Sequence, residues 1–220
     1  MKYIIPAIRF KIFMTILLGL IYPFTITGVS QVLFPKQAGG NFIMRGGQVV
    51  GSTLIAQSFE KPQYFWSRPS AVGYNPLPSG GSNLGQASAD LKKAVDERAA
   101  KLKAAHPDKA GEPPQDLLFA SASGLDPHIS IEAAQYQMQR VAKSRNLSIE
   151  QVNALLNEST AERQLGIFGE PTVNVLTLNI ALDKSQGIES APVLVPVPPV
   201  APAAAAAVPA ASPSTQTDTK

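Results

Sequence analysis

The sequence has no cysteine among its 220 residues, and only 16% of its residues are charged. The absence of cysteine excludes disulfide bonds, thiolate metal sites and cysteine nucleophiles. The charged fraction lies below the roughly 25% that is typical of soluble domains. At this length we expect one folded domain with appendages rather than two full domains.

An excess of basic residues in the body of the chain is also missing, although the formal net charge is +3. Residues 1–11 contain Lys2, Arg9 and Lys11 and no acidic residue, so the excess lies there. Residues 12–183 contain 14 basic and 14 acidic side chains. This balance argues against a nucleic-acid-binding face, and we expect no nucleic acid among the partners.

A long run without any charge covers residues 12–34 and predicts a transmembrane helix. As a helix this run would measure roughly 34 Å, which is enough to cross the hydrocarbon core of a bilayer. A cleaved signal peptide is the alternative, with residues 12–22 as its apolar region and a small-residue site at residues 28–30. Apolar residues continue to Phe34 and there is no Ala-x-Ala sequence, which favours a retained anchor.

The basic residues around this run predict its orientation. Lys2, Arg9 and Lys11 precede it, whereas only Lys36 and Arg45 follow within 15 residues. The positive-inside rule therefore predicts that residues 1–11 are cytoplasmic and that the rest of the chain lies outside the cytoplasm. The expected topology is that of a single-pass membrane protein with a cytoplasmic N-terminus.

Residues 35–183 predict one mixed α/β extracytoplasmic domain, so the expected fold class is α+β. Capping residues and apolar stripes predict helices at residues 88–105, 130–144 and 148–159. Ser88 and Ser130 are the expected caps of the first two helices. A Ser and Gln pair forms a capping box for the third.

The strands of this domain are less clearly marked. Residues 48–59 predict one or two strands interrupted at Gly51, and residues 117–119 predict a short strand. Residues 60–86 are rich in Pro, Gly, Ser and Asn, which is typical of a structured loop. The apolar stretch 173–182 fits either a strand or a helix.

The composition changes at residue 184. Residues 192–220 contain seven prolines and long alanine runs but no aromatic residue. Such a chain cannot bury a core, so residues 184–220 are predicted to form a disordered Ala/Pro-rich tail. We expect this tail to be a flexible spacer and truncation after Asp183 to leave function intact.

The two histidines offer little catalytic chemistry. His106 precedes a proline at a helix end and is expected at the surface. His128 follows Ser and Asp residues in the run 121–128, but no Gly-x-Ser-x-Gly elbow and no third metal ligand accompany them. We therefore predict no catalytic residue and no metal site, and interpret this run as a turn fixed by Gly124 and Pro127.

A glycine-rich loop at residues 79–83 is a candidate nucleotide-linked site. The surrounding run partly resembles the signature sequence of ABC ATPases, although the chain has no Walker A loop. Backbone amides of such a loop could bind phosphate, but a tight structural turn explains the same residues. The candidate residues are Ser79, Gly80, Gly81, Ser82 and Asn83.

An aromatic-rich stretch is the second candidate. Five of its residues are aromatic, and a nearby arginine could make a cation–π contact. The stretch is either a satellite core or a surface that docks a partner. These interface candidates are Phe59, Tyr64, Phe65, Trp66, Arg68 and Tyr74.

Several sequence blocks together resemble the C subunit of the Kdp-type potassium-transporting ATPase. The resemblance covers about residues 12–183 in order. The blocks include YFWSRPSA at 64–71, SGGSNLG at 79–85, SASGLDPHIS at 121–130 and GEP at 169–171. Residues beyond 183 extend past the usual end of this family.

The resemblance implies a single-pass, accessory and non-catalytic subunit of a potassium-uptake complex in a bacterial inner (plasma) membrane. Its implied partners are a potassium-channel-like subunit and a P-type ATPase subunit that hydrolyses ATP. The family is described as a catalytic chaperone that raises the ATP affinity of the pump subunit, and residues 79–83 would carry such a role. ATP is thus implied for the complex, while no cofactor is assigned to this chain.

The predicted orientation conflicts with direct ATP contact, because an extracytoplasmic loop cannot reach cytoplasmic ATP. Any effect on ATP affinity would then be a coupling free energy transmitted through the partner subunits. Assembly and stabilisation of the complex is the favoured role. The alternatives are a nucleotide-binding module that uses residues 79–83 and a secreted enzyme released by signal cleavage.

Overall fold

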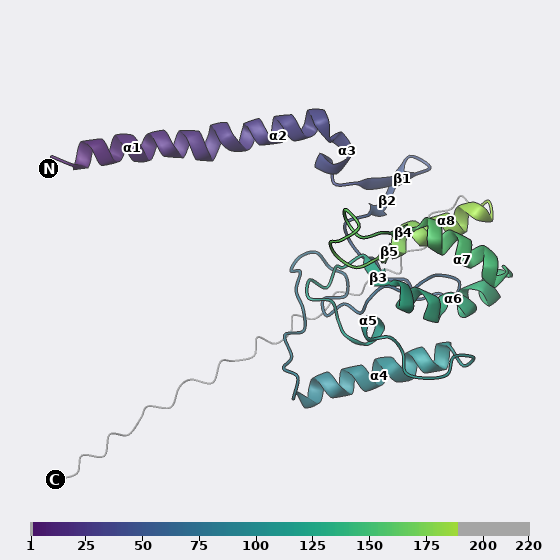
Figure 1. The fold of residues 1–220 in the computed structure, drawn as a ribbon. Helices are drawn as coiled ribbons and strands as arrows, with labels where there is room; N and C mark the ends of the chain where they lie inside the picture. The colour runs from purple at the N-terminus through teal and green to yellow at the C-terminus, as the bar shows by residue number, and fades with distance from the viewer. Residues whose placement is uncertain (1, 189–220) are drawn as a thin grey trace, which may run out of the picture.

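The structure, a computed structural model, describes residues 2–188. A long N-terminal helix leads into a domain of helices and small antiparallel sheets, as expected for the α+β class (Figure 1). Residues 189–220 lie outside the described residues, and most of the predicted tail lies with them. The last helix, α8 (Val175–Ser185), extends past residue 183, so the folded domain is longer than predicted.

The N-terminal helix is continuous over Ile4–Leu33, which is 30 residues, and its side chains are exposed. Its three consecutive segments are α1 (Ile4–Ile16), the π-helical η1 (Leu17–Ile21) and α2 (Tyr22–Leu33). The π-helical turn precedes Pro23, whose ring would clash with the carbonyl of Gly19 in a regular α-helix. The wider turn lets the helix continue through the proline.

This helix begins eight residues earlier than the predicted span. At about 1.5 Å per residue it measures roughly 45 Å, which exceeds the roughly 30 Å of a hydrocarbon core. Arg9 and Lys11 therefore lie on the helix itself, in the part that precedes the uncharged run. The helix is long and apolar enough to cross a membrane.

A short helix and a β-hairpin connect the N-terminal helix to the domain. They are α3 (Pro35–Ala38), β1 (Phe42–Arg45) and β2 (Gln48–Ser52). The strands pair antiparallel, with an irregular register between Ile43 and Met44. The strand predicted over residues 48–59 thus ends at Ser52, and its partner β1 was not predicted.

A second antiparallel sheet lies inside the domain, with the strand order β3-β5-β4. Its strands are β3 (His128–Ser130), β4 (Thr160–Ala161) and β5 (Thr172–Asn174). The ambiguous stretch 173–182 contains both structures, because β5 ends at Asn174 and α8 follows at once. The Asn174 side chain accepts a hydrogen bond from the backbone N–H of Thr177, which caps the helix and fixes the switch.

Three of the four remaining helices agree closely with the predicted ones. The four are α4 (Ala89–Ala105), α5 (Gln115–Leu118), α6 (Ile131–Arg145) and α7 (Ile149–Glu158). The caps at Ser88 and Ser130 and the capping box at Ser148 are confirmed. The strand predicted at residues 117–119 is wrong, because a helical turn buries Leu117 there. A short apolar run after prolines fits either structure, and only packing decides between them.

The hydrophobic core lies between α6, α7, α8 and the β3-β5-β4 sheet. It includes the completely buried side chains of Phe65, Ile129, Val141, Val152, Leu176 and Leu178. Phe65 comes from the long loop region and not from a helix or strand. Helix α4 lies at the margin, where Leu102 is its buried residue (Figure 1).

Candidate functional site

The aromatic residues of the loop divide into buried and half-buried groups. Phe59, Tyr64 and Phe65 are at most 6% exposed and belong to the core, whereas Trp66 and Tyr74 are half-buried. The core interpretation therefore holds for the first three. Their side chains are not accessible to a partner protein in this conformation.

Asn179 of α8 binds the loop backbone at Phe65. The backbone N–H of Phe65 donates to Asn179 Oδ1 at 2.8 Å, and Asn179 Nδ2 donates to the Phe65 carbonyl at 3.0 Å. The asparagine is 0% exposed. One side-chain amide thus supplies both partners that a neighbouring β-strand would supply, so Phe65 can be buried without unpaired backbone groups.

Gln137 of α6 does the same for the next residue. The Trp66 N–H donates to Gln137 Oε1 at 2.7 Å, and Gln137 Nε2 donates to the Trp66 carbonyl at 3.2 Å. Two arginines of α6 bind the carbonyls that come before: Arg140 donates to Pro62 and Tyr64, and Arg145 donates to Gln63 at 2.7 Å. Polar groups of α6 and α8 therefore hold the loop backbone from residue 62 to 66. We call residues 59–66 the clamped segment.

A buried ion pair lies below the clamped segment. Arg145 donates to Asp183 at 2.7 Å, and both side chains are almost completely buried. Arg45 of β1 and the Tyr64 hydroxyl also lie 3.3 Å from the Asp183 carboxylate. Burial, followed by the negative charge of Asp183, raises the pKa of Tyr64. The contacts of Asp183 with Arg45 and Arg145 thus connect β1 of the hairpin to α6 and α8 of the core.

His106 is not the surface residue that the sequence suggested, since it is only 3% exposed. Its Nε2 accepts from Arg140 at 2.9 Å, so Nδ1 carries the proton and donates to the Leu102 carbonyl at 2.7 Å. Burial first, and then the positive charge of Arg140, lowers the pKa of this imidazole. The histidine packs against aromatic rings because α4 ends over the clamped segment.

The cation–π contact to Trp66 is present, but with a different arginine. The guanidinium of Arg140 lies 4.2 Å from the indole centroid, whereas Arg68 pairs with Asp126 at 2.9 Å. Burial raises the pKa of Asp126, but hydrogen bonds from His128 and Arg68 outweigh it and lower the pKa to about 2. Arg68 therefore connects its own loop to the loop that contains Asp126.

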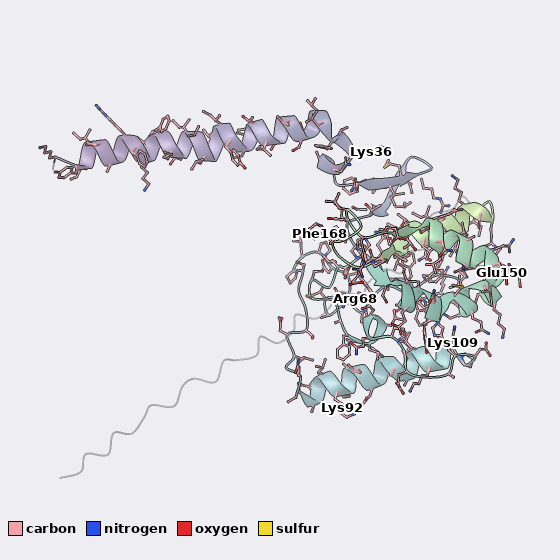
Figure 2. The ribbon with its side chains drawn as sticks, viewed as in Figure 1. Lys36, Arg68, Lys92, Lys109, Glu150 and Phe168 are labelled. Atoms are coloured by element: carbon pink, nitrogen blue, oxygen red, sulfur yellow. The ribbon has the colours of Figure 1, made fainter. Side chains whose placement is uncertain are left out.

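The Arg68 contact belongs to a loop junction, which we define as residues 67–83 together with residues 121–128. The backbone N–H of Ser121 donates to the Pro69 carbonyl, and that of Gly80 donates to the Ser123 carbonyl. Figure 2 places Arg68 on the side of the domain that faces back along the N-terminal helix, with Lys109 and Glu150 on the far side.

Two glycines allow the loops of the junction to approach each other. Gly124 has a φ of +69°, and a Cβ there would lie 2.8 Å from the Gly80 carbonyl oxygen. A Cβ on Gly81 would lie 2.9 Å from the carbonyl oxygen of Ala122. The glycine-rich sequence of residues 79–83 is therefore explained in part by close packing.

This packing bears on the candidate nucleotide-linked loop. The Gly80 amide is engaged by Ser123, so it could bind phosphate only if that contact broke. Ser79, Ser82 and Asn83 are exposed. A cavity of about 250 Å³ lies beside the junction, lined in part by Trp66, Tyr74, Arg98 and Lys101, and residues 79–83 lie outside it.

The run 121–128 forms the turn that was expected. The Asp126 carboxylate accepts from the backbone N–H of His128 at 3.0 Å and lies 3.6 Å from its Nδ1. Ser123 Oγ accepts from the backbone N–H of Leu125 at 3.1 Å. Within residues 2–188, no three His, Asp or Glu side chains are grouped as a metal site.

The clamping residues are the part of this region that sequence reasoning missed. Gln137 was predicted in a helix and Asn179 in the stretch left open between strand and helix, whereas Arg145 and Asp183 lay just beyond these ranges, and none of the four was given a role. The available signal was Asn179 and Asp183, spaced i, i+4 within an apolar helix. Polar residues on a buried helix face usually have specific partners.

Comparison with known proteins places the whole described chain in one family. Residues 4–184 match the KdpC family, described as the c chain of the K+-transporting ATPase. The chain belongs to the KdpC family. A potassium-transporting ATPase KdpC subunit of Serratia proteamaculans is 50% identical over 186 residues, which cover 83% of this chain and 98% of that protein. One from Geobacter sulfurreducens is 52% identical over 187 residues, with 83% and 98% coverage.

The KdpC match includes the N-terminal helix, both loops of the junction and the clamped segment. The match ends at residue 184. A third relative, a potassium-transporting ATPase KdpC subunit of Dechloromonas aromatica, is 51% identical, and the alignment covers 81% of this chain and 95% of that protein. The resemblance stated from the sequence blocks is therefore confirmed. The tail lies beyond the shared region.

Proposed function

We propose that this chain is a non-catalytic, single-span subunit of a potassium-uptake ATPase, and that its domain assembles and stabilises the complex from outside the cytoplasm. The observation that carries this proposal is the exposed apolar helix Ile4–Leu33 in a chain of the KdpC family. Basic residues lie just before this helix and in its first turns. Residues 1–11 would be cytoplasmic, residues 12–34 would cross the membrane, and the domain from residue 35 onward would be outside.

The partners in this proposal are a potassium-channel-like subunit and a P-type ATPase subunit. A rise in the ATP affinity of the pump subunit would then be an indirect effect, transmitted as a coupling free energy through the complex. The contact between Gly80 and Ser123 supports this indirect route, because it occupies an amide of the candidate phosphate loop. Direct ATP binding by residues 79–83 is the competing hypothesis.

Cysteine labelling can test the orientation, since the natural chain contributes no background thiol. Tyr3→Cys and Ser79→Cys both place a thiol at an exposed position without removing a basic residue. In intact spheroplasts we expect a membrane-impermeant maleimide to label the Ser79→Cys chain, and to label the Tyr3→Cys chain only after lysis. The reverse pattern would refute the proposed topology.

The same variant tests the nucleotide hypothesis. We expect ATP to leave the labelling rate of Ser79→Cys unchanged in lysed membranes that hold the full complex. If residues 79–83 bind ATP directly, millimolar ATP should protect this thiol. Such protection would overturn the indirect route.

Deletion of the chain tests the transport role itself. Without it we expect loss of growth at low potassium, poor recovery of the partner subunits as a complex, and a weaker apparent affinity of the pump for ATP. The full chain supplied in trans is the control. Normal growth together with normal assembly would refute the function.

A further inference from the structure

An exposed loop between β4 and β5 presents apolar side chains that nothing in the described structure covers. We call residues 162–170 the finger. Its base is closed by two backbone hydrogen bonds of 2.9 Å between Gln164 and Phe168. Leu165, Ile167 and Phe168 are 88%, 73% and 62% exposed. This is an ordered turn whose tip is apolar.

The backbone of the finger makes the exposure of Leu165 unusual. Its φ is +53°, in the left-handed region where a side chain with a Cβ is disfavoured. Burial of the leucine does not offset this strain in the isolated chain. Strained positions that persist without local compensation often belong to functional sites.

The finger lies at the end of the domain that carries the membrane helix. Figure 2 shows Phe168 on the side that faces back along that helix, opposite Glu150. Asn174, at the end of β5 away from the finger, donates to the Thr53 carbonyl at 2.8 Å, just after the hairpin that follows the helix. That hairpin also exposes Phe42, Met44 and Val49. Figures 1 and 2 thus place the finger and the hairpin at the same end of the domain.

The charges of the finger favour a protein over lipid headgroups as its partner. Arg163 pairs with Glu170 at 2.7 Å, which leaves Glu162 as the excess charge of the loop. Anionic bilayer surfaces attract basic segments, so a net acidic loop is poorly suited to them. A few exposed apolar anchors with a polar rim are typical of a protein interface.

We propose that the finger docks Leu165, Ile167 and Phe168 into an apolar pocket with a basic rim, on the extracytoplasmic surface of a membrane-embedded subunit of the same complex. This inference rests on the proposed function and names the surface that performs the assembly. Binding would desolvate the three anchors together. It would also fix the strained turn in the conformation that the free chain already holds.

The test uses the full complex, purified through a tag on a partner subunit. We expect the Leu165→Asp/Phe168→Asp chain to copurify at least about tenfold less than the natural chain, because two charges would enter an apolar pocket. Ile149→Asp, at an exposed apolar position next in sequence to Glu150, which Figure 2 shows on the side away from Phe168, is the matched control and should copurify normally. Phe168→Leu should retain binding.

Thermal unfolding of the full chain in detergent checks the fold of each variant. An unchanged melting temperature with lost copurification supports docking, while normal copurification of the double Asp variant overturns it. A second outcome would also overturn the proposal of a protein pocket. In it, the domain of the natural chain binds protein-free phosphatidylglycerol vesicles and the double Asp variant does not. If deletion of the chain abolishes growth at low potassium but the double variant grows and assembles, docking by the finger is wrong and the transport role stands.

Discussion

The clamped segment and the finger are both loops with apolar side chains, but they have opposite environments. Phe65 of the clamped segment is 0% exposed, whereas Phe168 of the finger is 62% exposed. The aromatic-rich composition predicted either a satellite core or a docking surface for the clamped segment, and the finger was given no role apart from the GEP block at its end. The structure supports the core interpretation for Phe59, Tyr64 and Phe65, and it shows the exposed apolar side chains on the finger.

The difference lies in where the polar backbone groups find partners. In the clamped segment, Asn179 and Gln137 satisfy the N–H and C=O groups of Phe65 and Trp66. In the finger, the described backbone hydrogen bonds all lie within the loop itself, among residues 163–168. A loop can be buried when distant helices supply hydrogen-bond partners for its backbone, whatever its own composition.

The comparison would fail if two phenylalanines in these loops contributed equally to stability. We expect Phe65→Ala to lower the free energy of unfolding by about 3–5 kcal/mol, because it leaves a cavity in the core. Phe168→Ala should change it by less than about 0.5 kcal/mol, since the ring is exposed. Urea unfolding of the full chain in detergent, followed by circular dichroism, measures both. Similar values would show that the finger is buried in the free chain.

The amide clamp itself can be removed next. Asn179→Ala leaves the N–H and C=O of Phe65 buried without their partner, so we expect a loss of about 2–4 kcal/mol. Asn157→Ala, at an exposed position on α7, is the matched control and should stay within about 0.5 kcal/mol of the natural chain. Chemical denaturation gives both values. An equal, small effect would mean that water can replace the clamp.

The smallest expected effect concerns the ion pair between Arg68 and Asp126 in the loop junction. The pKa of Asp126 is lowered to about 2 in the folded protein, below its unfolded value near 4, so its stabilisation is present above about pH 4 and is lost as the pH falls toward 2. Because the carboxyl is partly exposed, we expect less than about 1 kcal/mol.

Unfolding of Asp126→Asn at pH 6 and pH 3 checks this effect. The difference between the two pH values should be smaller than in the natural chain. Glu170→Gln removes the exposed finger pair and serves as the control, with little expected change in the same difference. An unchanged pH difference in Asp126→Asn would contradict the role of its pair with Arg68.

Helix caps and the uncharged run were predictable because they depend on residues close together in sequence. Ser88, Ser130 and Ser148 each cap the helix that follows, as local spacing indicated. The structure also requires one revision of the tail. Gln186 exchanges hydrogen bonds with Arg145, and Arg45 donates to the Ile188 carbonyl, so truncation after Asp183 would remove contacts of the domain. Truncation after residue 188 is the cleaner test of a spacer role.

The candidate sites were less predictable. Residues 79–83 and the run 121–128 were predicted as two separate motifs. In the structure they pack against each other through Gly80, Gly81 and Gly124. His106 was placed at the surface because its helix ends there, but α6 supplies the ring that covers it and the arginine that binds it. No local pattern reports a neighbour that lies more than 30 residues away.

The sequence alone therefore determined the long apolar N-terminal helix, the helices α4, α6 and α7 and the KdpC resemblance, because these depend on composition, short spacing and matching blocks. Only the tertiary structure decided which loop is core and which is exposed. That choice depends on polar side chains of α6 and α8 that reach the backbone of the clamped segment across more than 70 residues of chain. Among residues 2–188, no side chain of a distant element binds the backbone of the finger in this way, and its apolar tip stays exposed.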